Sequence, residues 1–124
     1  MGILTTDMQQ LVREQRLAFV ASVNADGTPS LSPKATATVF DDDHLAYLDV
    51  ASPGTRANVA ANPVLEINVI DHILRRGYRF RGEARLLTEG AEYGRAMTLF
   101  GPHGALARRS HGVMMIRVTR ATPL

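Results

Sequence analysis

Apolar and polar positions alternate over much of the chain, and this pattern predicts more strand than helix. The first segment is the exception, because Met8, Leu11 and Val12 share one helical face and predict a helix over residues 6–15. Thr6, followed three residues later by Gln9, fits the capping-box pattern at its start. We therefore expect one short helix before the first strand.

Turn signals divide the next part of the chain into antiparallel strands. The stretch LAFVASVNADGTPSLSP predicts a hairpin that turns at Asp26 and Gly27. Its second strand continues through KATATVF until the acidic run 41–43 breaks it, and HLAYLDV is the third strand. A short helix follows Pro53 and ends at Pro63.

The second half predicts three more strands. VLEINVI is a β-branched run, GYRFRGEARLL places arginines on one face and aromatic residues on the other, and GVMMIRVTRA closes the chain. Between the last two, Tyr93, Met97 and Phe100 recur at helical spacing. About six antiparallel strands and three helices predict a mainly-β fold, a small barrel that forms a single domain over residues 1–124.

Composition narrows the chemistry. The absence of cysteine excludes disulfides, thiolate metal sites and a cysteine nucleophile. The net charge is +2, and Lys34 is the only lysine among many arginines. An arginine bias suits planar or phosphate-bearing ligands, and the alternative is that it reflects a GC-rich genome. No signal-peptide pattern and no membrane-length apolar run occur, so we expect a cytoplasmic protein without a membrane partner.

The stretch SPGTRANVAANP is a candidate phosphate site. Thr55 falls at or near the start of the predicted helix, where unpaired N–H groups and the helix dipole favour an anion. Arg56 would add charge to that site. The alternative is that Thr55 only caps the helix and Arg56 is a solvated side chain.

Lys34 is a second candidate. It lies in LSPKA, where Pro33 removes one ladder donor, as fits an edge or interrupted strand beside a ligand. The alternative is an edge-strand lysine that discourages aggregation. The four histidines show no metal-site spacing, so we expect no metal; they belong to the surface or to loops, and only His103 and His111 are considered as lining of a ligand mouth.

The order of these motifs resembles the flavin-binding split-barrel family typified by pyridoxamine 5′-phosphate oxidase. The stretches DGTPSLSP, YLDVASPGTRANV and ANP carry the resemblance, which is nearest to the short bacterial FMN-binding proteins and covers nearly the whole chain. It implies a six-stranded antiparallel split barrel that binds FMN at a homodimer interface. The apolar final strand GVMMIRV agrees with a buried surface shared by two copies.

The resemblance also implies a set of site residues. By position, the FMN phosphate would be held by Thr55 and Arg56, the flavin ring would meet the backbone of residues 49–51, and Leu124 would lie near the partner's ligand. Family members often carry lysine or arginine where this chain has Gly54. The implied cofactor-binding residues are Ser32, Pro33, Lys34, Asp49, Val50, Ala51, Ser52, Thr55, Arg56 and Leu124.

Three classes of function follow from this reading. The first is an FMN-dependent oxidoreductase that acts on an unknown small molecule, and pyridoxamine phosphate is not assigned because no histidine follows His111. The second is a non-catalytic flavin carrier or electron-transfer protein. A variant of the first class is an enzyme that uses the deazaflavin F420 in place of FMN. The third is a nucleic-acid-binding barrel suggested by RRGYRFR, whose aromatic residues alternate away from its arginines; we therefore expect no nucleic-acid partner.

Overall fold

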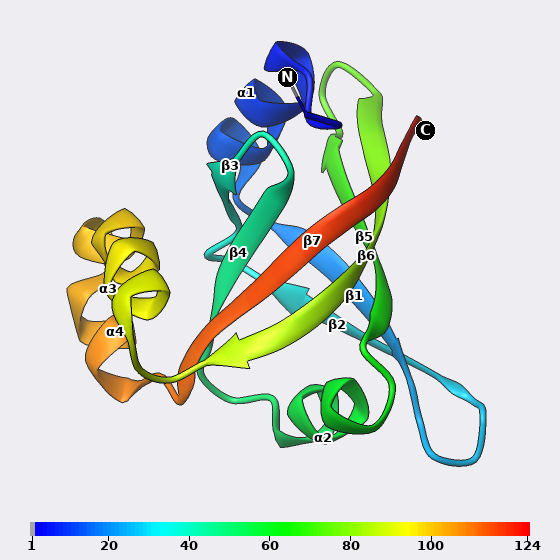
Figure 1. Cartoon of the computed structure of the whole chain (residues 1–124). Coiled ribbons are helices and arrows are strands. Elements are labelled where there is room, and N and C mark those ends of the chain that lie inside the picture. Colours follow the sequence, from blue (N-terminus) through cyan, green and yellow to red (C-terminus); the bar gives the residue numbers. More distant parts are fainter. Residues whose placement is uncertain (1) are drawn as a thin grey trace.

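The computed structural model describes residues 2–124, in which one antiparallel sheet curls around an apolar interior (Figure 1). Its strand order is β2-β1-β5-β6-β7-β4-β3. The strands are β1 Ala18–Val23, β2 Pro29–Lys34, β3 Thr38–Asp41, β4 His44–Asp49, β5 Val64–Asp71, β6 Arg76–Leu87 and β7 Gly112–Pro123. The helices are α1 Thr6–Gln15, α2 Pro53–Ala61, α3 Ala91–Met97, the 3₁₀ helix η1 Thr98–His103 and α4 Gly104–Arg109.

The mainly-β prediction is confirmed, but the sheet has seven strands because the expected long second strand is two. The chain leaves the ladder at residues 35–37, and the Ala37 N–H donates to the Arg16 carbonyl at 3.0 Å. β2 therefore pairs with β1, whereas β3 pairs with β4. These two strands are the edges of the sheet, and the barrel is split along the seam between them.

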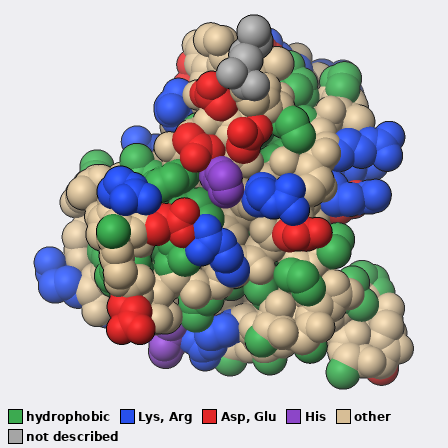
Figure 2. Space-filling model, viewed as in Figure 1, with side chains coloured by type: hydrophobic (Ala, Val, Ile, Leu, Met, Phe, Trp, Pro, Cys, Tyr) green, Lys and Arg blue, Asp and Glu red, His purple; other side chains and the backbone are tan. Residues whose placement is uncertain are grey.

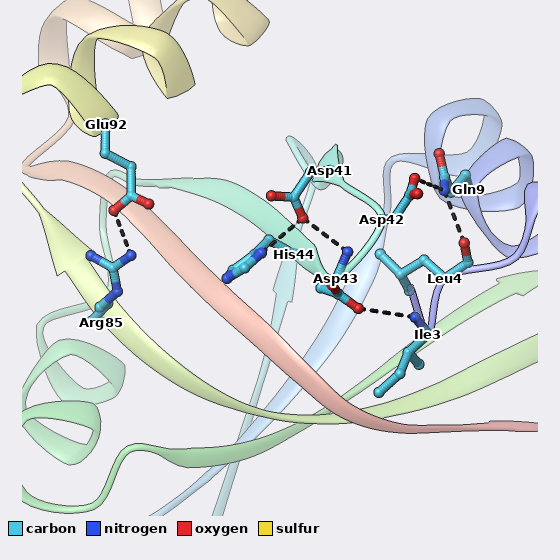
Figure 3. Close-up of polar contacts among 9 residues, drawn as sticks. All are labelled: Ile3, Leu4, Gln9, Asp41, Asp42, Asp43, His44, Arg85 and Glu92. Atoms are coloured by element: carbon cyan, nitrogen blue, oxygen red, sulfur yellow. Dashed lines mark hydrogen bonds and ion pairs between the residues drawn. The ribbon is translucent and has the colours of Figure 1, made fainter. Parts of the chain in front are cut away.

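Helix α1 keeps its predicted bounds but has a different cap. Thr5, not Thr6, accepts the capping hydrogen bond. The Gln9 amide donates instead to Asp42 Oδ1 at 3.1 Å, and the Asp43 carboxylate accepts an N–H from the N-terminal segment (Figure 3). The acidic turn that separates β3 from β4 therefore also anchors the start of the chain.

Strand β4 and residues 112–116 of β7 are buried on both faces, which explains the nearly continuous apolar sequence of these stretches. In β4, Leu45 and Tyr47 face the barrel interior, while Ala46 and Leu48 face a second apolar cluster. Helices α3, η1 and α4 supply the other side of that cluster (Figure 1). The apolar final strand is thus covered by helices of its own chain, which removes it as an argument for a dimer.

The helical spacing up to Phe100 predicted one helix here, with His103 on the surface or in a loop, and the structure corrects this prediction. The chain continues as η1 and then as α4, whose Leu106 and Ala107 pack against the second cluster. None of the helices in residues 2–124 combines the length and the apolar character needed to cross a bilayer.

Candidate cofactor site

A hollow of about 240 Å³ lies between the end of β2 and the end of β4. It is lined by Pro33, Lys34, Ala35, Thr36, Leu48, Val50, Ala51, Ser52 and Leu106. Five of these are sequence-predicted cofactor residues: Pro33, Lys34, Val50, Ala51 and Ser52. The seam of the barrel and the loop after β4 therefore meet at one cavity, which we call the cofactor hollow.

Lys34 ends the edge strand β2 and is buried, with 8% of its surface exposed. Its ammonium donates a hydrogen bond to the Ser52 hydroxyl and lies 5.6 Å from the centre of the Tyr47 ring. Burial lowers the pKa of Lys34, and the nearby Asp49 carboxylate opposes that shift. An inward-facing lysine of this kind does not protect an exposed edge; it brings a poorly hydrated positive charge to the wall of the cofactor hollow.

Arg56 has a protein partner. Its guanidinium donates to Asp49 Oδ2 at 3.2 Å, and the Asp49 side chain is only 2% exposed. Neither Arg56 nor Thr55 lines the cofactor hollow. A phosphate contact for Arg56 stays a prediction; in this structure its side chain neutralises a buried carboxylate and joins α2 to the end of β4.

The start of α2 has donors without helical partners. Ser52 is the N-cap residue and its hydroxyl makes no capping hydrogen bond, so Thr55 belongs to the first turn and is not the cap. Pro53 has no N–H, which leaves the N–H groups of Gly54 and Thr55 as the first donors of the helix. These groups follow directly after Ser52, which lines the cofactor hollow.

Two buried hydroxyls within residues 2–124 lack a hydrogen-bond partner, Ser32 Oγ and Tyr47 Oη. Burial, together with the negative charge of Asp49, raises the pKa of Tyr47 far above its ordinary value, so its phenol stays neutral. A buried polar atom without a partner costs about 1–3 kcal/mol. A polar ligand or water that reached either hydroxyl from the barrel seam would offset that cost.

Leu124 lies at the other end of the molecule from the cofactor hollow. Its N–H donates to the Gly77 carbonyl at 2.9 Å, and half of its surface is exposed. Asp49 pairs with Gly112 at the start of β7, whereas Leu124 follows the end of that 12-residue strand, roughly 35–40 Å of chain away. Within one protomer the structure does not bring Leu124 to the hollow.

The two histidines that the sequence analysis considered together are separated. The His111 N–H donates to the Asp49 carbonyl at 2.7 Å, which places this exposed residue beside the end of β4. His103 instead lies against Arg16, with 3.4 Å between its Nε2 atom and the guanidinium. Sequence reasoning missed four lining residues, because their places depend on how the seam, β4 and α4 pack: Ala35, Thr36, Leu48 and Leu106.

Two arginines of RRGYRFR, Arg79 and Arg81, line a small hollow of about 110 Å³ with Arg120, but Glu66 lies in the same hollow. Arg76 pairs with Asp7 on α1, and Arg81 pairs with Glu66 on the neighbouring strand. Figure 2 shows acidic and basic side chains interspersed over the visible face, without a broad surface of one sign. This arrangement gives no support to a nucleic-acid interface on that face.

Comparison with known proteins agrees with this architecture. HupZ from Group A Streptococcus is 35% identical, with a TM-score of 0.85 over 97% of this chain and 93% of its own. An FMN-binding protein from Syntrophomonas wolfei subsp. wolfei shares the fold at 14% identity, with a TM-score of 0.79 over 98% and 86%. The heme storage protein HutZ from Vibrio cholerae shares it at 18% identity, with a TM-score of 0.70 over 98% and 94%.

No curated protein is significantly similar to the chain. The sequence model of pyridoxamine 5′-phosphate oxidase, however, matches residues 4–122, from the segment before α1 to the last residue but one of β7. That match includes every strand of the split barrel and all residues that line the cofactor hollow. The chain therefore belongs to the pyridoxamine 5′-phosphate oxidase family.

Proposed function

We propose that this chain binds FMN in the cofactor hollow and acts as a flavin-dependent oxidoreductase on a small molecule. The observation that carries the proposal is the buried Lys34 ammonium on the wall of the hollow, next to Ser52 and the free N–H groups at the start of α2. A positive charge beside unpaired helix donors is a favourable environment for a phosphate group. Membership of a family that includes oxidoreductases supports the assignment.

The residues of the hollow divide into two groups by chemistry. Lys34 and Ser52, with the first N–H groups of α2, would hold the phosphate, and the backbone at Val50 and Ala51 would hold the ring edge. Arg56 would contribute less to phosphate binding than the sequence suggested, because its guanidinium already pairs with Asp49. When bound, FMN supplies electron or hydride transfer, and this chain supplies binding and orientation.

The absorbance spectrum of the purified protein, followed by titration of FMN and riboflavin, tests this proposal. Lys34→Gln should weaken FMN about tenfold to a hundredfold and leave riboflavin, which lacks the phosphate, unchanged. Arg108→Gln, which alters an exposed arginine of α4, is the matched control. Absence of flavin binding, or equal loss for both flavins, would contradict the proposal. Flavin binding without turnover of any electron donor would favour a carrier, and binding of F420 in place of FMN would favour the deazaflavin alternative.

Heme binding is a second candidate, favoured by the position of His111. Imidazole is a common axial ligand of heme, and this exposed histidine is held beside the end of β4 by its hydrogen bond to Asp49. The likeness to HutZ, described as a heme storage protein, supports testing it. Titration with hemin should give a Soret band that His111→Ala removes and His72→Ala, on the β5–β6 turn, retains. No Soret shift with the parent protein would exclude this candidate.

We also propose that the protein is a homodimer. The support is an exposed apolar area on the outer face of β1 and β2, where Phe19 is 38% and Leu31 is 69% exposed. Both line a shallow hollow of about 250 Å³. A second copy covering this area would bury the apolar surface and bring a second C-terminus to the assembly.

A further inference from the structure

A second hollow of about 180 Å³ lies next to the cofactor hollow, between the end of α1, the seam and η1. Thr36 lines both hollows, so the two adjoin along the seam. Its hydroxyl oxygen accepts the Leu48 N–H at 3.0 Å, which leaves the hydroxyl proton free to donate. Three cationic or donor side chains reach the second hollow from two different elements: Arg13, Arg16 and His103.

Arg16 is held in place by its backbone and by its side chain. It caps α1 in the left-handed conformation, with φ of 59°, and its carbonyl accepts the Ala37 N–H. Its Nε atom donates to the Arg13 carbonyl at 3.3 Å. The terminal nitrogen lies 3.4 Å from His103 Nε2, and because a guanidinium only donates, that Nε2 atom must be the acceptor. The remaining donors are available to a ligand.

Neither arginine forms an ion pair within residues 2–124, which is also true of other exposed arginines, but no carboxylate lines the second hollow either. Positive side chains interact favourably with the negative, carbonyl end of the helix dipole, and this effect accounts for the two arginines near the end of α1. That effect does not account for His103, which comes from η1, 87 positions later in the sequence. Donors that converge on one hollow without a carboxylate point to an anion supplied from outside.

We propose that Arg13, Arg16 and His103 form a subsite for the carboxylate or phosphate group of a small organic anion, the substrate of the reaction. This inference rests on the proposed function, since it places substrate and cofactor in adjoining hollows joined at Thr36. A guanidinium pairs with either oxyanion through two parallel N–H groups. The apolar residues Leu99 and Phe100 would face the carbon skeleton of the substrate.

The test reads the subsite without any flavin, by following the imidazole signals of the whole protein in NMR spectra. Inorganic phosphate and acetate are titrated separately, and His103→Gln assigns the reporting signal. We expect a saturable shift of the His103 signal with at least one anion. Arg16→Gln should weaken that anion about tenfold or more, and Arg16→Lys should retain part of the affinity. Arg75→Gln is the matched control, because Arg75 is also exposed and has a positive φ of 56°.

The outcomes separate this inference from the proposed function. Absence of a saturable His103 shift, or a shift that Arg16→Gln leaves unchanged, overturns the subsite even if FMN binds. A lower melting temperature for Arg16→Gln with unchanged anion affinity shows that the arginines serve only the end of α1. An intact anion response in a protein that binds no flavin supports the subsite and rejects the proposed function. Equal weakening of FMN and of the anion by Arg16→Gln also overturns it, because the second hollow would then be part of the cofactor site.

Discussion

The guanidinium of Arg56 donates a hydrogen bond of 3.2 Å to the carboxylate of Asp49, which is almost completely buried. Asp49 ends β4 and Arg56 lies in the first turns of α2, so the pair closes the loop that contributes residues 50–52 to the cofactor hollow. The same carboxylate is near the Lys34 ammonium. The shape of the hollow therefore depends on an ion pair outside it.

Arg56→Gln should lower the free energy of unfolding by about 1–3 kcal/mol, because it leaves a buried carboxylate with fewer donors. Asp49→Asn removes the charge that needs neutralising, so the double variant should lose less than the sum of the two single variants. A double-mutant cycle in urea measures that coupling. Arg95→Gln, an exposed change in α3, is the control. Additive losses would show that the two side chains do not interact in solution.

Lys34→Met should raise the free energy of unfolding at pH 7. The lowered pKa of Lys34 means that burial disfavours the ammonium more than Asp49 attracts it. At a pH below the Lys34 pKa of both the folded and the unfolded state, the folded protein bears the full cost of burying the ammonium. That cost vanishes as the pH rises through the lowered folded-state pKa towards the unfolded value of 10.5. The gain from Lys34→Met should thus shrink between pH 7 and pH about 10.5, as urea unfolding at several pH values would show. A gain in the free energy of unfolding that stays constant over this pH range would contradict a lowered pKa of Lys34.

Gly112→Ala should destabilise the protein by about 1–3 kcal/mol or more. Gly112 has φ of 148°, and an added Cβ would lie 2.3 Å from the Leu87 carbonyl oxygen, where β6 and β7 meet. Gly94→Ala is the matched control, because Gly94 lies in α3 with open space around it and should gain up to about 1 kcal/mol. Thermal unfolding of both variants checks the prediction, which similar melting temperatures would refute.

Leu31→Glu should convert the proposed homodimer into a monomer at micromolar concentration. The change adds charge to the exposed apolar area around Phe19. Leu31 lines neither the cofactor hollow nor the second hollow beside it. Ile73→Glu, at the equally exposed tip of the β5–β6 turn, should leave the dimer intact. Sedimentation velocity of the three proteins decides the matter: a monomeric parent, or a dimer insensitive to Leu31→Glu, would exclude this interface.

Local signals were sufficient for most of the fold. The helical spacing of Met8, Leu11 and Val12 and the turn at Gly27, whose φ is 87°, are properties of a few neighbouring residues. The break at residues 35–37 has no such signal, since alternation runs through it and the deciding contact is the Ala37 hydrogen bond to Arg16. Helix α4 was missed because glycine and proline near His103 resemble a loop, although Leu106 packs as a helical residue.

The site was predictable in position but not in detail. The strand-then-turn motif located Val50, Ala51 and Ser52, which do line the cofactor hollow. The inward direction of Lys34 depends on which face of β2 is buried, and the commitment of Arg56 depends on the tertiary position of Asp49. Such contacts depend on how the elements pack and leave no periodic trace in a sequence.

The strand order has a consequence for biosynthesis. β7 is the last strand in chain order within residues 2–124, yet it is the strand whose ladders join β2-β1-β5-β6 to β4-β3. A nascent chain that ends before Gly112 therefore has two separate strand sets with open edges, and such edges pair readily with other chains. The sheet can close only after β7 has been synthesised, which makes translation arrest before or within β7 a point of aggregation risk.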